Sequence, residues 1–244
     1  MRRTFAAATA ALVAVALLTC AAPCGAEPAN ETSVELIRPI GDVYNERTTD
    51  GDAYGSSLAA RAAFVRGEYS LSLAWWRNVY LTESAGAGSL TRYARIEGGF
   101  GTVPPFVATE SSLEARLERR IAGGPLYAGV GLVHTWTNYH YPALTGAGIG
   151  AELRASARAG VRPFASAFYY PSASGSYVTE APPARTLTPA FSILKLDAGV
   201  VLRTARSPVY GVLGYANETR SGHGLPSDVR FIRSDPYLGI GAKI

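Results

Sequence analysis

Apolar and polar residues alternate strictly along residues 147–161. The odd positions from Ala147 to Val161 are all apolar, and the even positions between them are glycine, serine or charged. A period of two places these two sets on opposite faces of a β-strand. Strands of soluble proteins usually have about five or six residues, whereas a tilted strand that crosses a bilayer needs about nine to eleven. The pattern therefore predicts a membrane-spanning strand over 147–161.

The same alternation recurs along the chain and predicts an all-β protein. Short turns rich in Gly and Pro alternate with longer stretches rich in Gly, Ser, Thr and Pro, near 138–146, 171–189 and 217–230. This alternation is typical of a barrel with short periplasmic turns and longer outer loops. We predict ten strands, near 34–41, 56–65, 68–81, 111–121, 125–137, 147–161, 163–171, 190–203, 208–217 and 230–244. Eight or twelve follow if the first strand is absent, or if residues 91–110 form a hairpin within the wall.

The C-terminal residues 237–244 carry apolar side chains at alternating positions, namely Leu238, Ile240, Ala242 and Ile244. In this the chain resembles bacterial outer-membrane β-barrel proteins, whose closing strand has the same pattern and is read by the barrel-assembly machinery. Ile244 stands where that family usually has Phe or another aromatic residue. The resemblance implies a closed antiparallel up-and-down transmembrane β-barrel in the bacterial outer membrane. It also implies outer-membrane lipid and the barrel-assembly machinery as partners, with no transferable active site.

The first residues indicate export. Two arginines follow Met1, residues 5–18 are apolar and alanine-rich, and small residues continue to Ala26. A basic start, a short apolar core and a small-residue exit are typical of a secretory signal peptide. We predict a signal peptide over 1–26 and one barrel domain over 27–244. A lipoprotein signal ending at Cys20 is the alternative. Cleavage after Ala26 removes both cysteines, so the mature chain offers no disulfide or thiol chemistry.

Charge adds little to this picture. Loss of Arg2 and Arg3 takes the basic residues from 23 to 21 against 19 acidic residues, a net charge near +2. The sequence contains no nucleic-acid motif, phosphate-binding glycine loop or metal-ligand spacing that we can identify. We therefore predict no nucleic-acid partner, no cofactor and no metal.

Acidic and basic residues alternate with apolar ones on several predicted strands, which places them in the barrel interior. Ten strands leave room mainly for side chains, and buried charges need partners. We therefore predict a structural plug of ion pairs, with a small charged pore or gate as the alternative. The residues of this predicted lumen network are Glu114, Arg116, Glu118, Arg120, Glu152, Arg154, Arg158, Lys195, Asp197 and Arg203.

Aromatic residues gather near the strand ends that this topology places at the outer membrane–water interface. There they would form an aromatic girdle, although aromatic residues also favour strands and cores in general. The predicted girdle consists of Trp75, Trp76, Tyr80, Trp136, Tyr139, Tyr141, Phe168 and Tyr170.

Three functional classes remain open from the sequence. The favoured one is a barrel with a structural, ligand-binding or small-pore role, whose loops contact a cell-surface ligand through Tyr177, Glu180, Arg185, His223 or Asp228. The second is an outer-membrane enzyme acting on lipid or peptide at the outer rim. Its base would be His134 or His140, near Ser166, Ser172 or Ser174. The third is a soluble lipocalin-like barrel, whose apolar face would point inward.

Overall fold

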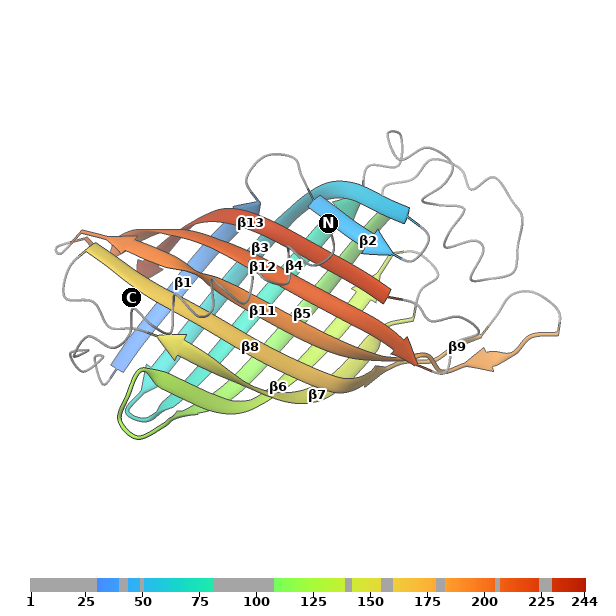
Figure 1. Ribbon diagram of the computed structural model, residues 1–244, viewed down its shortest axis with the longest axis horizontal. Helices are drawn as coiled ribbons and strands as arrows, with labels where there is room; N and C mark the ends of the chain where they lie inside the picture. The colour runs from blue at the N-terminus through green and yellow to red at the C-terminus, as the bar shows by residue number, and fades with distance from the viewer. Residues whose placement is uncertain are drawn as a thin grey trace, which may run out of the picture.

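Eleven strands form one antiparallel sheet that closes on itself (Figure 1). The computed structural model describes residues 30–39, 44–48, 51–80, 108–138, 142–154, 160–178, 183–204, 207–223 and 230–244. Within these ranges, β1 and β2 both lie between β13 and β3 and share one position in the wall. The wall therefore has ten strand positions, and the prediction of a closed up-and-down barrel is confirmed.

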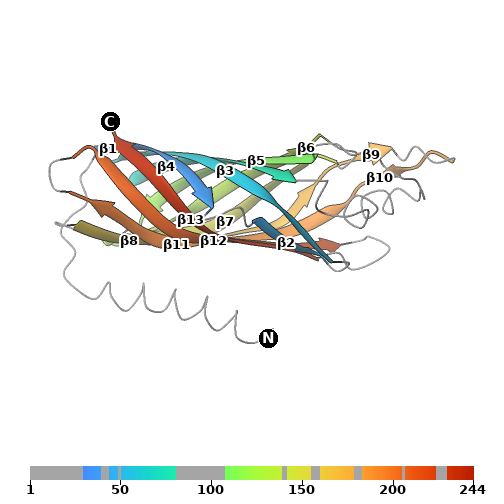
Figure 2. The ribbon, with the colours of Figure 1, turned by 90° about the horizontal axis from the view of Figure 1, so that it is seen from above.

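The strands follow the chain in order around the barrel. Their bounds are β1 (Asn30–Pro39), β2 (Tyr44–Thr48), β3 (Gly51–Arg66), β4 (Tyr69–Tyr80), β5 (Ala108–Arg120), β6 (Leu126–Thr137), β7 (Leu144–Arg154), β8 (Gly160–Ser174), β11 (Ala190–Arg203), β12 (Val209–His223) and β13 (Arg230–Lys243). A separate two-stranded ladder, β9 (Tyr177–Val178) with β10 (Thr186–Leu187), continues from β8 and β11 beyond one end of the barrel (Figure 2).

The two ends of the barrel differ. At the short-turn end, β3 joins β4 through residues 67–68 and β5 joins β6 through residues 121–125. Gly67 adopts a φ of 60° there, a left-handed conformation that glycine accepts without steric cost. The first residues of β1 and the C-terminal Ile244 lie at this same end, where the Ile244 amide donates to the Thr32 carbonyl. The opposite end, which β9 and β10 extend, is called the long-loop end.

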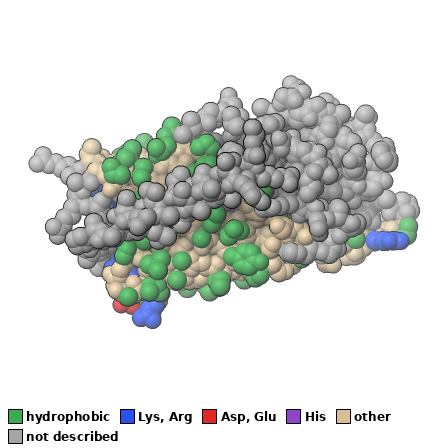
Figure 3. Space-filling model, viewed as in Figure 1, with side chains coloured by type: hydrophobic (Ala, Val, Ile, Leu, Met, Phe, Trp, Pro, Cys, Tyr) green, Lys and Arg blue, Asp and Glu red, His purple; other side chains and the backbone are tan. Residues whose placement is uncertain are grey.

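The wall has an apolar outer face, as the alternation predicts. Val130 and Leu132 of β6 are 57% and 59% exposed, whereas their neighbour Val133 is 1% exposed and points inward. Hydrophobic side chains gather over the visible part of the wall (Figure 3). The apolar face thus points outward, whereas the lipocalin-like alternative expects it to point inward. The described residues contain no helix of the length and hydrophobicity needed to span a membrane.

Interior glycines make room for interior aromatic rings. A Cβ atom on Gly150 would lie 2.5 Å from Cγ of Phe168, and one on Gly241 would lie 2.4 Å from Cζ of Tyr210. Both distances are shorter than real contacts. At these two positions glycine therefore leaves room for a large ring from the neighbouring strand.

Several predicted boundaries are wrong, among them the predicted loop over 171–189, which contains the end of β8 and the ladder of β9 and β10. β7 ends at Arg154 and β8 begins at Gly160, so the predicted single strand over 147–161 spans the end of one strand and the start of the next. The alternation continues through the break because small residues satisfy it without specifying pairing. Gly160 marks the break with a φ of 73°. The predicted hairpin over 91–110 lies mostly outside the described residues.

The predicted loop over 217–230 is also wrong over its first part, because β12 continues to His223 and pairs with β13 as far as Ser221. Its outward residues change there from apolar to Asn217, Thr219 and Ser221. The strand thus extends beyond the apolar band, where both of its faces are polar and the hydrophobic period disappears.

Candidate functional site

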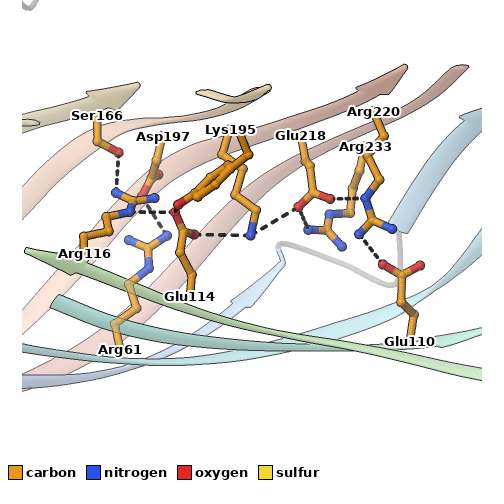
Figure 4. A network of polar contacts seen from close by, with 11 residues as sticks. Arg61, Glu110, Glu114, Arg116, Ser166, Lys195, Asp197, Glu218, Arg220 and Arg233 are labelled. Atoms are coloured by element: carbon orange, nitrogen blue, oxygen red, sulfur yellow. Dashed lines mark hydrogen bonds and ion pairs between the residues drawn. The ribbon is translucent and has the colours of Figure 1, made fainter. Parts of the chain in front are cut away.

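The charged interior is centred on Glu114 of β5, whose side chain is 2% exposed (Figure 4). Arg116 Nε donates to Glu114 Oε1 at 2.7 Å, and Lys195 Nζ donates to Glu114 Oε2 at 3.2 Å. The Tyr170 hydroxyl also donates to Glu114. Three wall strands lie between β5 and β11 by the shorter route around the sheet, so the Lys195 contact crosses the interior.

Lys195 connects this centre to a second cluster toward the long-loop end. Its Nζ lies 3.6 Å from Glu218 Oε2. Glu218 also accepts hydrogen bonds from Arg220 Nε at 2.5 Å and from an Arg233 nitrogen at 2.6 Å. Arg220 in turn pairs with Glu110 of β5. These four residues, Glu110, Glu218, Arg220 and Arg233, are called the upper cluster, and each is at most 9% exposed.

A separate pair bridges β3 and β11. A guanidinium nitrogen of Arg61 lies 2.7 Å from Asp197 Oδ2, and the Tyr237 hydroxyl donates to Asp197 Oδ1 at 2.7 Å. The Arg61 guanidinium carbon lies 5.6 Å from the Trp76 ring centroid and 5.2 Å from that of Tyr237. Charge pairing and cation–π contact therefore both stabilise this buried guanidinium.

Nearer the short-turn end, one arginine is shared by two carboxylates. Arg154 Nε donates to Glu152 Oε1 at 2.7 Å, and its Nη2 lies 3.4 Å from Glu118 Oε2. The same nitrogen donates to Ser72 Oγ at 2.9 Å. Glu118 is 1% exposed, and its Oε1 has no hydrogen-bond partner among the described residues.

The cavity between these groups is electrically balanced. A cavity of about 140 Å³ runs along the interior and is lined by six acidic and six basic residues, which is room for on the order of ten water molecules. The acidic residues are Glu31, Glu35, Glu114, Glu152, Asp197 and Glu218, and the basic residues are Arg61, Arg116, Arg154, Arg162, Lys195 and Arg233. Because acidic and basic residues are equal in number, we expect them to neutralise one another rather than to select cations or anions.

Two apolar clusters pack against the charged groups inside the barrel. One includes Trp76, Tyr210 and Tyr237, and the other includes Phe168, Tyr170 and Phe191. These rings are at most 6% exposed. Together with the ion pairs they fill much of the interior with side chains, as expected for a barrel of this strand number.

Most of the predicted lumen network lies inside the barrel. Glu114, Arg116 and Lys195 meet at its centre, Asp197 pairs with Arg61, and the remaining central residues are Glu118, Glu152 and Arg154. Two residues lie apart from these contacts, because Arg120 donates to the Tyr127 hydroxyl and Arg203 donates to the Ser207 carbonyl. Arg158 falls outside the described residues.

Sequence reasoning missed the upper cluster and Arg61. Arg61 lies on a predicted strand, and its parity would have placed it inside. Glu218 and Arg220 fell in a predicted loop, and Glu110 preceded a predicted strand start. The available signal for Glu110, Glu218 and Arg220 was that inward-facing residues continue at every second position. It was not recognised because the residues between them are polar as well, so the two faces of the strand do not differ in hydrophobicity.

The predicted aromatic girdle needs correction. Trp76, Phe168 and Tyr170 face the interior and are 6%, 0% and 0% exposed. Adjacent residues of a strand point to opposite faces, so Trp75 and Tyr169 take the outward positions. Trp136 is also outward and 38% exposed. The side chain of Tyr80, and both Tyr139 and Tyr141, lie outside the described part of the chain.

The proposed enzyme pairing around His134 is not formed. His134 is exposed on the outer face, and its Nδ1 lies 2.8 Å from Thr145 Oγ1. Ser166 points inward and accepts a bond from Arg116 at 3.1 Å, so the barrel wall lies between this serine and His134. Ser172 and Ser174 are exposed. His140 is outside the described ranges, and those ranges contain no cluster of three metal-ligating side chains.

The loop candidates lie around the long-loop end. Tyr177 begins β9, Arg185 directly precedes β10, and His223 ends β12. Glu180 and Asp228 fall outside the described residues. The structure therefore does not bring these five residues into one described site.

The C-terminal strand closes the barrel. β13 pairs with β12 on one side and with β1 on the other. Leu238, Ile240 and Ile244 are 53%, 59% and 84% exposed on the outer face. Its alternating apolar residues thus contribute to the outer apolar band.

No protein-family model matches the chain, and no curated protein sequence matches it. Among solved structures, the chain is similar to neisserial surface protein A, with 10% identity and a TM-score of 0.44 over 88% of this chain and 97% of that one. The N-terminal β-barrel domain of OprF from Pseudomonas aeruginosa has 12% identity and a TM-score of 0.30, over 88% and 99% of the two chains. A deletion mutant of the monoaromatic hydrocarbon channel TodX has 10% identity and a TM-score of 0.30, over 86% and 68%.

Proposed function

We propose that the protein is an integral outer-membrane barrel whose lumen is closed by its own side chains, and that it serves as a structural scaffold for its long-loop end. The observation that carries this proposal is the opposite chemistry of the two faces of one wall. Exposed apolar residues cover the outside, and paired charges fill the inside. This arrangement suits a bilayer outside and a polar interior.

Closure of the lumen is supported by contacts that cross it. Lys195 joins Glu114 and Glu218, and Arg220 joins Glu110, so side chains from non-adjacent strands meet inside the barrel. Removing one partner of a buried ion pair costs about 3–5 kcal/mol. The lumen could open only if several of these ion pairs broke at once, so thermal opening of the lumen is rare.

The membrane location is tested by fractionation and gel mobility. We expect the full chain, expressed in a Gram-negative host, in the outer-membrane fraction, migrating faster on a detergent gel before boiling than after it. We further expect a mature N-terminus at Glu27, which an intact mass reports. A chain found wholly in the soluble fraction would contradict the proposal.

The closed lumen is tested by conductance. We expect the purified barrel in a planar bilayer to give no stable conductance steps. The double variant Glu110→Ala/Arg220→Ala removes both members of a cross-lumen pair, leaves Glu218 paired with Lys195 and Arg233, and should increase conductance. The matched control, Glu68→Ala/Arg119→Ala, removes an exposed pair outside the lumen and should conduct no more than the parent. Stable steps from the parent chain would favour the small pore instead.

A further inference from the structure

The outer face changes character over three neighbouring rows of side chains between β3 and β7. The first row is apolar and consists of Ala62, Leu73, Ala115, Leu132 and Ala147. The next row toward the long-loop end consists of Ala60, Trp75, Leu113, His134 and Thr145. The third consists of Leu58, Arg77, Ser111 and Trp136. The edge of the apolar band therefore crosses these rows.

At this edge the His134 ring is held in place by two contacts. Its Nδ1 lies 2.8 Å from Thr145 Oγ1, and the ring stacks on Trp136 with centroids 5.4 Å apart and planes 26° apart. Because the threonine occupies Nδ1, Nε2 is the ring nitrogen that can meet a ligand. Both His134 and Trp136 are exposed.

Arg77 brings a cation to the same edge. It is exposed on the outer face of β4, because its neighbours Trp76 and Asn78 are buried on the inner face. Arg77 and Trp136 are the two register partners of Ser111, so their Cα atoms are separated by two strand spacings, about 10 Å. Side chains of this length can reach one ligand across that distance. The three rows contain no Asp or Glu.

We propose that Arg77, His134 and Trp136 form a binding site for the phosphate headgroup of a membrane lipid, in particular a phosphomonoester. This inference rests on the proposed membrane location. The guanidinium group of an arginine can donate two parallel hydrogen bonds to the oxygens of one phosphate. Tryptophan prefers the membrane depth at which the lipid headgroups meet the apolar region. The site combines one permanently charged guanidinium, one oriented imidazole and an aromatic surface at the boundary where lipid phosphates lie.

The test uses the full chain refolded in a non-ionic detergent, with bound lipid counted by native mass spectrometry. The probe is dioleoyl phosphatidic acid, and dioleoyl phosphatidylcholine is the reference lipid. We expect Arg77→Gln to weaken binding of phosphatidic acid roughly tenfold, the loss of one charge-assisted contact. His134→Gln should weaken it less, and neither should change binding of phosphatidylcholine. Arg66→Gln is the matched control, because Arg66 is also an exposed arginine of the outer face but lies at the short-turn end.

Equal weakening by Arg77→Gln and Arg66→Gln would overturn the site, since it would reveal general attraction to negative lipid. Equal affinity of the parent for the two lipids would overturn it as well. Flotation with lipid vesicles separates this failure from failure of the proposed function. A barrel that floats but does not discriminate contradicts the lipid site alone, whereas a refolded chain that does not float contradicts the membrane location.

Discussion

Arg61 of β3 and Asp197 of β11 form an ion pair of 2.7 Å across the barrel interior, although three other wall strands lie between theirs by the shorter route. Their side chains are 18% and 15% exposed. Contact between distant walls shows that side chains span the lumen at this level. The pair therefore links the stability of the barrel to the closure of its interior.

Replacing Asp197 with Ala should destabilise the barrel, because the Arg61 guanidinium loses its buried counter-charge. We expect the free energy of unfolding to fall by about 3–5 kcal/mol, measured by urea titration in detergent with tryptophan fluorescence. The double variant Arg61→Met/Asp197→Leu should recover most of this loss. Glu68→Gln is the control, since the Arg119–Glu68 pair is about 60% exposed on each side and should change stability by at most about 1 kcal/mol. An Asp197→Ala loss no larger than the control would contradict the pairing.

Gly150→Ala should be destabilising although the change adds one methyl group. The new Cβ would lie 2.5 Å from Phe168 Cγ and 2.3 Å from the Ala167 carbonyl oxygen, and such overpacking costs about 1–3 kcal/mol. Gly211→Ala is the matched control, because its nearest neighbour would be 3.9 Å away. The same urea titration compares the two. Equal stability of both variants would show that the interior near Phe168 is not closely packed.

The sequence predicts the strand count and the inside–outside assignment well where one face of a strand meets an apolar environment. Leu132 is 59% exposed and its neighbour Val133 is 1% exposed, and the alternation along β6 predicts that difference. The same rule places Glu114 and Lys195 inside without knowledge of their partners. Alternation specifies the face of a side chain, because the side-chain period of a strand is two.

Alternation does not specify where a strand ends when both faces are polar or small. For that reason the sequence missed the extension of β12 that carries Glu218 and Arg220, and it missed the break after Arg154. Alternation also does not predict which residues pair across the lumen. The pairing of Arg61 with Asp197 depends on barrel shear and strand tilt, which are properties of the closed sheet.

Leu132→Arg distinguishes a membrane barrel from a soluble one. Leu132 is 59% exposed on the outer face, so an arginine there should have little effect on a barrel surrounded by water. In a bilayer, a lipid-facing arginine one row inside the edge of the apolar band costs about 1–2 kcal/mol, between its cost at mid-depth and its cost at the interface. We expect the unfolding free energy in lipid vesicles to fall by that amount relative to Leu132→Ala. Equal stability of the two variants in vesicles would contradict a lipid-facing position.

The most direct test of the two-faced wall uses its adjacent tryptophans. The chain has three, Trp75, Trp76 and Trp136. Trp75 faces outward, whereas Trp76 is 6% exposed inside the barrel, near Arg61 and Arg233. Two single-tryptophan variants, with the other two tryptophans changed to Phe, are refolded into vesicles that contain brominated phosphatidylcholine. The structure predicts that brominated acyl chains quench the fluorescence of Trp75 strongly and that of Trp76 weakly. Stronger quenching of Trp76 than of Trp75 would contradict the assignment of the apolar face to lipid and of the charged face to a closed interior.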